Sequence, residues 1–508
     1  MKNIFIKSLT ISLILITSLA NVSAQESSTL QFMKGVPQSN LLNPALHNDS
    51  SAVIIGLPGL SGMYFDANSD FAVNDLFHKG TGIRADSLIT DITRFHSVLK
   101  NTNAVEQNFS LPIIYLGFRV KKSFFSFGIT EKEIAQFTFD KSFVTFIMDG
   151  NAPYIGQNFD LGNLSINAIH YREYAFGYSN ELIKNKLKIG VKVKALYGKS
   201  AIQTERMNLK VETAADASYL NLRSDMKINM SMPVTVEYDS ISQFSGMNGD
   251  NVKPKDYMLQ TGNTGMAFDF GVVYKLTPKI LLSGSIVDMG KISFKKDINN
   301  LTHISTYKWE GIDFSKSIDN SKPDYVDPSD LADAEMKKVE KSFKPKKSEF
   351  DSKPFDVSIP TKIYLGGTYA VNDKFSIGLI DRLYKNGSVS KNSVTLSGNA
   401  MLGNIFSLTG SYSMIGDSYN NVGVGMAVRL GFMQLYIAGD NVLAMKPATA
   451  NYDNARFGIN FLFGRNRHPK VAIKQEVELQ QVPEVVPDVI PEVTPEVDPV
   501  VVPEQKKE

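Results

Sequence analysis

Residues 393–414 read SVTLSGNAMLGNIFSLTGSYSM, two alternating runs of apolar and polar residues around a Gly-Asn pair. One parity of the first run carries Val394 and Leu396, and the other carries Thr395 and Ser397. Successive side chains of a β-strand point to opposite faces, so the pattern predicts a hairpin with one apolar and one polar face. The apolar face suits either the core of a soluble sandwich or the lipid-facing surface of a membrane barrel. The rest of the chain has to distinguish these two classes.

The same two-residue period recurs along most of the chain. We predict fourteen strands, at residues 51–66, 108–120, 122–133, 163–179, 186–200, 265–276, 279–289, 359–371, 373–384, 392–402, 404–414, 420–430, 432–441 and 454–463. Alternate connections are short, for example at Lys121, Asn372, Gly403 and Gly431, whereas residues 67–107, 134–162, 201–264 and 290–358 form four long ones. Short turns at one end and long loops at the other are typical of outer-membrane barrels.

These features predict an all-β protein: an antiparallel transmembrane β-barrel of about 14 strands with short periplasmic turns and long extracellular loops. The apolar face is then expected to meet lipid. Two of the long loops are expected to contain helices. One lies in ADSLITDITRFHSVLK (85–100), with Asp86 or Ser87 as its N-cap, and the other in VDPSDLADAEMKKVEKSF (326–343), with Asp327 as N-cap and Pro328 as first residue.

Both ends of the chain differ from the barrel in composition. Residues 1–24 have early lysines, the apolar run LTISLILITSLA and small residues before Gln25, which predicts a secretory signal peptide cleaved after Ala24; an anchoring helix is the alternative. The barrel is expected over 25–465. Residues 466–508 contain a proline every fourth residue from Pro483 to Pro503, which excludes helix and favours an extended periplasmic tail. The alternative is a tail without a partner.

Composition excludes several classes of function. The chain has no cysteine, which removes disulfides, thiol catalysis and cysteine metal sites. Its formal net charge of +2 gives no general attraction to nucleic acid. The six histidines include no H-x-x-x-H or H-E-x-x-H pattern, and no G-x-S-x-G motif occurs. We therefore expect no metal, no cofactor and no catalytic residues.

Charged residues on the inward parity of the predicted strands are the candidate functional residues. Alternation points seven of them into the lumen: Lys188, Lys192, Lys194, Asp269, Lys275, Arg429 and Arg456. They could line a polar, rather basic pathway, or they could form internal salt bridges that fill a narrow barrel. Glycines on the inward parity, namely Gly423, Gly425 and Gly458, favour close packing or a plug.

Two segments resemble a known family. VPQSNLLNPAL (36–46) and GFMQLYIAGDNVLAMKPATANYDNARFGINFLFG (431–464), which contains the pair Asp440-Asn441, resemble the first and last segments of an uncharacterised family of outer-membrane barrels from Bacteroidetes. The likeness runs from about residue 30 to 465. More distantly, the Asn-Pro-Ala start and the strand number are similar to long-chain fatty-acid transporter barrels and to barrels of Bacteroidetes secretion and gliding. The resemblance implies a fold and a location but no established substrate.

Two functions follow as hypotheses for a non-enzymatic, integral outer-membrane protein whose partner is membrane lipid. The first is transport of a small or hydrophobic solute across the outer membrane. The second is a structural or assembly role in the cell envelope, as in secretion or gliding machinery, with the tail docking to a periplasmic or peptidoglycan partner.

Overall fold

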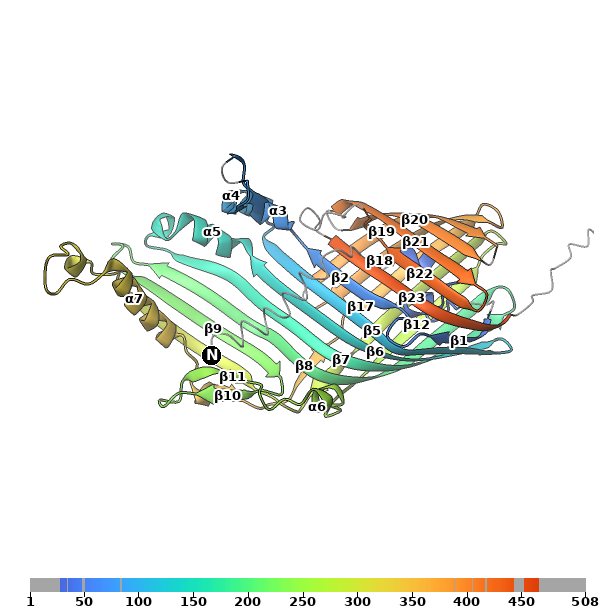
Figure 1. The fold of residues 1–508 in the computed structure, drawn as a ribbon, viewed down its shortest axis with the longest axis horizontal. Coiled ribbons are helices and arrows are strands. Elements are labelled where there is room, and N and C mark those ends of the chain that lie inside the picture. Colours follow the sequence, from blue (N-terminus) through green and yellow to red (C-terminus); the bar gives the residue numbers. More distant parts are fainter. Residues whose placement is uncertain are drawn as a thin grey trace, which may run out of the picture. The chain divides into compact units, whose positions relative to one another are not determined.

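A computed structural model describes residues 28–33, 35–47, 51–82, 85–387, 389–403, 405–415, 418–442 and 452–465. The predicted signal peptide and the predicted tail lie outside these residues. Fourteen antiparallel strands close into a β-barrel (Figure 1). The last strand, β23 (Tyr452–Arg465), pairs with the first strand, which is interrupted into β1 (Ser51–Gly56) and β2 (Met63–Ser69). This pairing completes the ring and confirms the predicted fold class.

The remaining barrel strands follow one another around the wall. They are β5 (Thr102–Val120), β6 (Ser123–Asp140), β7 (Asn158–Ile183), β8 (Leu187–Thr213), β12 (Asn263–Lys275), β13 (Ile280–Phe294), β17 (Thr361–Ala370), β18 (Phe375–Asn386), β19 (Val389–Leu402), β20 (Phe406–Ile415), β21 (Ser418–Leu430) and β22 (Met433–Gly439). All fourteen predicted strands are confirmed. The first is corrected, because residues 57–62 interrupt the segment expected as one strand.

The hairpin at 393–414 shows which face of the strands points into the barrel. Thr395, Ser397 and Thr409 are buried inside the barrel, whereas Leu396 is 52% exposed and Leu408 is 42% exposed on its outer surface. The same arrangement holds along β18, where alternate residues are buried and exposed. The apolar face therefore points outward and the polar face inward, as predicted.

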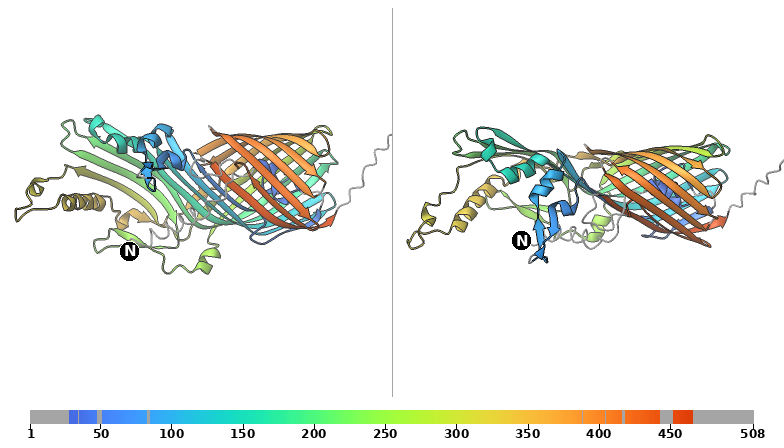
Figure 2. Two further views of the ribbon diagram at one scale, coloured as in Figure 1. Left: turned by 45° about the horizontal axis from the view of Figure 1, so that its top comes forward. Right: turned by 90° about the horizontal axis from the view of Figure 1, so that it is seen from above.

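Several strands extend well beyond the barrel. β7 has 26 residues and β8 has 27, and their distal halves continue into a sheet with β9 (Leu220–Ser231) and β14 (Asn300–Trp309) (Figures 1 and 2). The expectation that 134–162 and 201–264 are mainly loops was wrong. Charged pairs stabilise this sheet where apolar alternation is weak: Arg206 lies 2.8 Å from Asp225, and Arg223 lies 2.9 Å from Glu212.

The long connections between barrel strands contain short helices and strands. They are α3 (Val73–Leu76), β3 (Phe77–Lys79), β4 (Leu88–Thr90), α4 (Ile92–Val98), α5 (Lys141–Asp149), η3 (Ala152–Tyr154), β10 (Thr235–Tyr238), β11 (Phe244–Asn248), α6 (Pro254–Met258), η4 (Ser315–Ser317), α7 (Pro328–Ser342), η5 (Lys347–Glu349), β15 (Phe350–Asp351) and β16 (Phe355–Ser358). No helix among the described residues is long and apolar enough to cross a membrane.

The two helix predictions had different outcomes. α7 begins at Pro328 with Asp327 as N-cap, as expected. The helix expected to begin near Asp86 instead begins at Ile92, because Asp91 caps it by accepting from the Arg94 N–H at 2.8 Å. Leu88 precedes that cap and lies in β4, which pairs with β3.

The N-terminal residues 28–33 and 35–47, which we call the plug, lie inside the barrel (Figure 2). The plug contains α2 (Ser28–Phe32) and the 3-10 helix η1 (Pro37–Leu41). Its apolar side chains form a core with residues of the wall: Leu30, Phe32, Met33, Val36 and Leu42 pack with Val287, Tyr364, Ile380, Ala427, Tyr436 and Ala438. The polar lumen face is thus covered by a folded segment of the same chain.

Inward glycines make room for the plug. A Cβ on Gly423 would lie 2.6 Å from Thr29 Oγ1, and one on Gly425 would lie 2.6 Å from the sulfur of Met33. The prediction of close packing or a plug is therefore confirmed at these two positions. At Gly458 the close-packing alternative is confirmed, because a Cβ there would clash with Tyr436 Cε1 and would lie 2.9 Å from the Gly62 nitrogen.

Candidate functional site

A cavity lies inside the barrel beside the plug. Its volume is about 80 Å³, counted as the space in which the centre of a water molecule fits. The plug contributes Gln38, Leu41 and Leu42, and the wall contributes residues from β2, β5, β6, β7, β8, β13, β17 and β23. A polar space of this size can hold water or a small solute.

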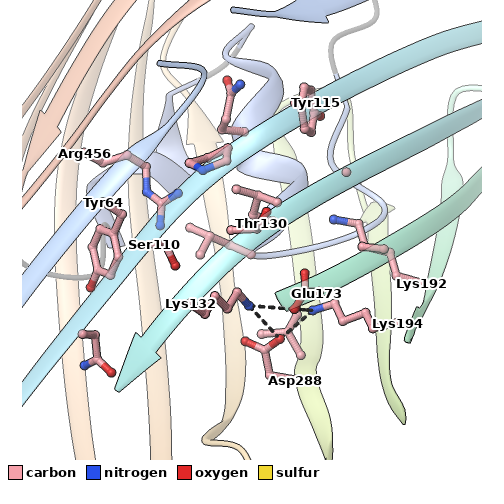
Figure 3. A pocket seen from close by; sticks show the side chains of 18 of the residues that line it. Tyr64, Ser110, Tyr115, Thr130, Lys132, Glu173, Lys192, Lys194, Asp288 and Arg456 are labelled. Atoms are coloured by element: carbon pink, nitrogen blue, oxygen red, sulfur yellow. Dashed lines mark hydrogen bonds and ion pairs between the residues drawn. The ribbon is translucent and has the colours of Figure 1, made fainter. Parts of the chain in front are cut away.

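Aromatic rings and small hydroxyls cover much of the cavity (Figure 3). Tyr64 and Tyr115 come from β2 and β5, and Ser110 and Thr130 come from β5 and β6. The Tyr115 hydroxyl donates to the carbonyl oxygen of Pro37 in the plug at 3.1 Å. The lining therefore offers flat apolar surfaces next to groups that can form hydrogen bonds.

The wall is interrupted next to this cavity. Residues 57–62 separate β1 from β2. Ser61 within this interruption and Tyr64 just after it line the cavity. Pro112 of β5 lies opposite, where it has no N–H to donate and where its carbonyl accepts from the Gly59 N–H at 2.9 Å. The sequence thus places a proline and a Pro-Gly turn where the strand ladder is broken.

A network of ion pairs forms the charged side of the cavity (Figure 3). Lys132 Nζ lies 2.8 Å from Glu173 and 3.4 Å from Asp288, and Lys194 Nζ lies 2.6 Å from Asp288. Lys194 also lies 2.8 Å from Asp269, which is fully buried. The side chains come from five consecutive strands of the wall, β6, β7, β8, β12 and β13, so the network connects that part of the wall.

Two further cations face the cavity outside this network. Lys192 donates to the carbonyl oxygen of Asn40 in the plug at 2.7 Å. The Arg456 guanidinium lies 4.4 Å from the centroid of the Tyr64 ring and donates through Nη1 to the Gly62 carbonyl at 3.4 Å. Its Nε has no hydrogen-bond partner within the described part of the chain, although only 5% of the residue is exposed. The Arg456 guanidinium thus contributes a positive charge to the cavity lining, a group suited to an anion.

A side-chain contact between β5 and β18, two strands that do not pair with each other, also bridges the lumen. Tyr384 of β18 donates to a carboxylate oxygen of Glu106 of β5, and both residues are buried. Asn108 donates to Asp66 at 2.6 Å beside it. Together with the plug, this contact narrows the passage through the described structure.

The seven residues predicted to line the lumen fall into two groups. Lys192, Lys194 and Arg456 line the cavity, and Asp269 is buried behind Lys194. Lys188, Lys275 and Arg429 lie near the short turns, away from the cavity; Lys275 is exposed, and Arg429 donates to the Gly431 carbonyl at 3.1 Å. Lys194 and Asp269 form the kind of internal salt bridge that we gave as the alternative to a polar pathway.

Sequence reasoning missed Lys132, Glu173 and Asp288. Lys132 and Glu173 lie in predicted strands, so the alternation of side chains could have placed both of them in the lumen. Asp288 lies at a bulge, where the register shifts between Phe268 and Phe270 of β12 and the Asp288 backbone has a φ of 60°. The bulge turns inward a side chain that strict alternation would place outside.

No group of three or more His, Asp or Glu side chains that could hold a metal ion occurs among residues with a described position.

Comparison with known proteins gives distant structural relatives and one family. The Ralstonia pickettii toluene transporter TbuX is 8% identical, with a TM-score of 0.38 over 84% of this chain and 94% of that chain. The Pseudomonas putida toluene transporter TodX is 9% identical (TM-score 0.35; 87% and 95%), and a Pseudomonas aeruginosa FadL homologue is 11% identical (TM-score 0.34; 88% and 98%). We draw no conclusion about a solute from likenesses this distant.

No curated protein matches the chain in sequence. The segment that matches a family spans most of the barrel, from Pro44 in the plug through β22. Residues 44–440 match the family of unknown function DUF5723, and the chain belongs to that family.

Proposed function

We propose that the protein is a non-enzymatic barrel of the outer membrane that transports a small amphipathic solute between the exterior and the periplasm. The outward apolar surface supports membrane insertion, since a lipid-exposed backbone must satisfy all its hydrogen bonds and a closed barrel does so. The short turns would lie in the periplasm and the extended strands outside. The observation that carries the transport proposal is the cavity between the plug and the wall.

The cavity lining indicates the chemistry of the solute. Tyr64 and Tyr115 offer flat apolar surfaces, while Arg456 contributes a guanidinium to the same lining. Lining cations outnumber lining carboxylates: Lys132, Lys192, Lys194, Lys362 and Arg456 against Glu173 and Asp288. A molecule with an apolar or aromatic body and an anionic group satisfies both parts of the lining.

Uptake of naphthalene-1-sulfonate into proteoliposomes tests this proposal. We expect uptake by the natural chain to exceed uptake of a naphthyltrimethylammonium ion of similar size. Arg456→Gln should lower the uptake of the anion about tenfold, the size of a lost charged hydrogen bond. Arg429→Gln is the matched control, because Arg429 lies away from the cavity. Equal uptake of both ions, or no uptake by a correctly inserted barrel, would overturn the transport proposal.

The location has its own test. The mature protein should fractionate with the outer membrane and should migrate differently on gels before and after heating, as closed barrels do. Recovery as a soluble periplasmic protein would show that the outward apolar surface has another role.

A structural role is the second candidate, and the filled lumen is the observation that favours it. The plug and the Glu106–Tyr384 contact both obstruct the barrel, which suits a scaffold that conducts nothing. Under this proposal the proline-rich residues 469–508 dock to a periplasmic or cell-wall partner. Deleting them should leave the barrel inserted but weaken sedimentation with peptidoglycan. Identical copurifying partners and identical sedimentation for both forms would make the tail a passive extension.

A further inference from the structure

A charged cluster lies on the outer surface of the barrel wall. Lys132 of β6 and Tyr171 and Glu173 of β7 line the internal cavity. The alternate positions of these two paired strands are occupied by Glu131, His170 and Arg172, whose side chains therefore point outward. Arg172 Nε lies 2.6 Å from Glu131, and His170 Nε2 lies 3.1 Å from the same carboxylate. Glu131 is nevertheless buried. Something on the outside of the barrel must cover it.

The residues next to this cluster mark the edge of the apolar surface. On the side of the short turns, Phe176 is 52% exposed and Val193 is 43% exposed. Between them and the cluster, the rings of Tyr174 and Tyr197 pack edge to face at 5.5 Å. Tyrosines concentrate at membrane–water interfaces, because one end of the ring is apolar and the other is polar. The charged cluster therefore lies at the level of the lipid headgroups.

The cover is the segment that contains α6, residues 252–260, which we call the strap (Figure 1). The Tyr257 hydroxyl lies 2.6 Å from His170 Nδ1 and 3.1 Å from Ser200 Oγ. Lys199 Nζ donates to the carbonyls of Met258 at 2.6 Å and Gln260 at 3.0 Å. The strap is thus clamped by side chains against the outside of β7 and β8.

The free side of the strap has the composition of an interfacial anchor. Leu259 is 59% exposed. It precedes β12, whose outward residues Met266, Phe268 and Phe270 belong to the exposed apolar surface. Lys253 and Lys255 are exposed on the same segment, and they outnumber its one carboxylate, Asp256. Apolar groups flanked by cations bind anionic bilayer surfaces.

We propose that the strap is a lipid-binding surface that lies on the outer leaflet of the membrane. Leu259 enters the boundary between headgroups and acyl chains, and Lys253 and Lys255 contact phosphate groups of anionic lipids. The inference rests on the proposed insertion of the barrel in a membrane. It adds a surface contact that the barrel itself does not require.

Quenching of tryptophan fluorescence by brominated lipids tests the proposal. The chain contains one tryptophan, so Trp309→Phe provides a silent background. Three single tryptophans are introduced into this background. Leu259→Trp is compared with Val193→Trp, which lies in the outward apolar surface, and with Ile318→Trp, at a position where Ile318 is 84% exposed in the extended region. We expect bromolipid bilayers to quench Leu259→Trp and Val193→Trp at least twofold and to leave Ile318→Trp unchanged.

The three positions separate the outcomes. If Val193→Trp is quenched and Leu259→Trp behaves like Ile318→Trp, the strap does not touch lipid and this inference is wrong. If Val193→Trp is not quenched, the barrel is not in the bilayer, and the proposed function fails together with the strap contact.

Two further variants test the charge and the clamp. Lys253→Glu combined with Lys255→Glu should reduce quenching of Leu259→Trp in bilayers containing phosphatidylglycerol but not in neutral phosphatidylcholine. Tyr257→Phe removes both hydrogen bonds of the tyrosine hydroxyl and should reduce quenching in both lipids. Quenching that is insensitive to lipid charge would overturn the role of the two lysines.

Discussion

The backbone N–H of Thr29 donates to the carboxylate of Asp440 at 2.9 Å, joining residues 411 positions apart in the chain. The N–H of Ser28 donates to the other carboxylate oxygen at 2.9 Å, and the Thr29 hydroxyl donates to Asp440 as well. Asp440 follows the inward-facing residues of β22 and is fully buried. One carboxylate thus fastens the first helix of the plug to the wall.

Asp440→Ala should loosen the plug. The substitution leaves two buried N–H groups without acceptors, and each such group costs about 1–3 kcal/mol. The loss at one of these groups alone shifts an equilibrium about 5- to 150-fold, so openings in planar bilayers should become at least about fivefold more frequent. Asp381→Ala is the control, since Asp381 lies on the outer surface of β18. Unchanged opening would mean that Asp440 does not hold the plug.

Charge on the outer surface should prevent stable insertion. Leu408→Arg places a cation on the lipid-facing side of β20, at a cost of about 2–4 kcal/mol near the bilayer midplane. Ser110→Arg places the same side chain in the cavity, where it should be better tolerated. The measurement is the fraction of heat-modifiable barrel after refolding into lipid vesicles. Equal fractions for both variants would show that the assignment of inside and outside is wrong.

Removing Asp288 should destabilise the barrel wall. The Asp288 carboxylate lies 2.6 Å from Lys194 and 3.4 Å from both Lys132 and Lys362. Asp288→Asn removes its negative charge from all three ion pairs. Breaking a buried ion pair in this way costs about 3–5 kcal/mol. Urea unfolding in lipid vesicles should therefore shift to a lower midpoint. Asp288→Asn combined with Lys194→Met should recover part of the loss, and a failure to recover would argue against the pairing.

Acid should fray α7 from its N-terminal end. The Asp327 carboxylate accepts from the Ser329 N–H at 2.9 Å and from its hydroxyl at 2.6 Å, which lowers the pKa of Asp327. Because the pKa of Asp327 is lower in the folded helix than its ordinary value of about 3.8, the carboxylate stabilises the helix fully at pH values above 3.8. This stabilisation is lost as the pH falls through the pKa of the folded state. The protection of the amides of residues 329–331 against hydrogen exchange, relative to their intrinsic rates, should fall in acid. At neutral pH Asp327→Ala should reproduce this effect, whereas Asp333→Ala in the same helix should not.

The alternation of side chains predicted the strands well because lipid and lumen impose opposite polarity on the two faces of each strand. Thr395 and Leu396 follow this rule, and so do the alternating residues of β18. The extended sheet was not predicted, because pairs such as Arg206 and Asp225 stabilise it without an apolar face.

The plug and the charged network required contacts that sequence spacing does not reveal. Thr29 and Asp440 are neighbours only after the barrel has closed. Asp288 faces inward only because of a bulge in β13. Inward glycines gave the one usable signal for the plug, since Gly423 and Gly425 leave room that Thr29 and Met33 occupy.

A reversible lock on the plug tests the central claim, that movement of the plug opens the barrel to a solute. The Thr29 and Ser411 side-chain oxygens lie 2.7 Å apart, and the chain has no other cysteine to interfere with Thr29→Cys and Ser411→Cys. The measurement is naphthalene-1-sulfonate uptake into proteoliposomes by the double variant, before and after reduction. We predict no uptake in the oxidised form and restored uptake after reduction, with both single variants insensitive to reductant. Uptake that does not change on reduction would contradict the account.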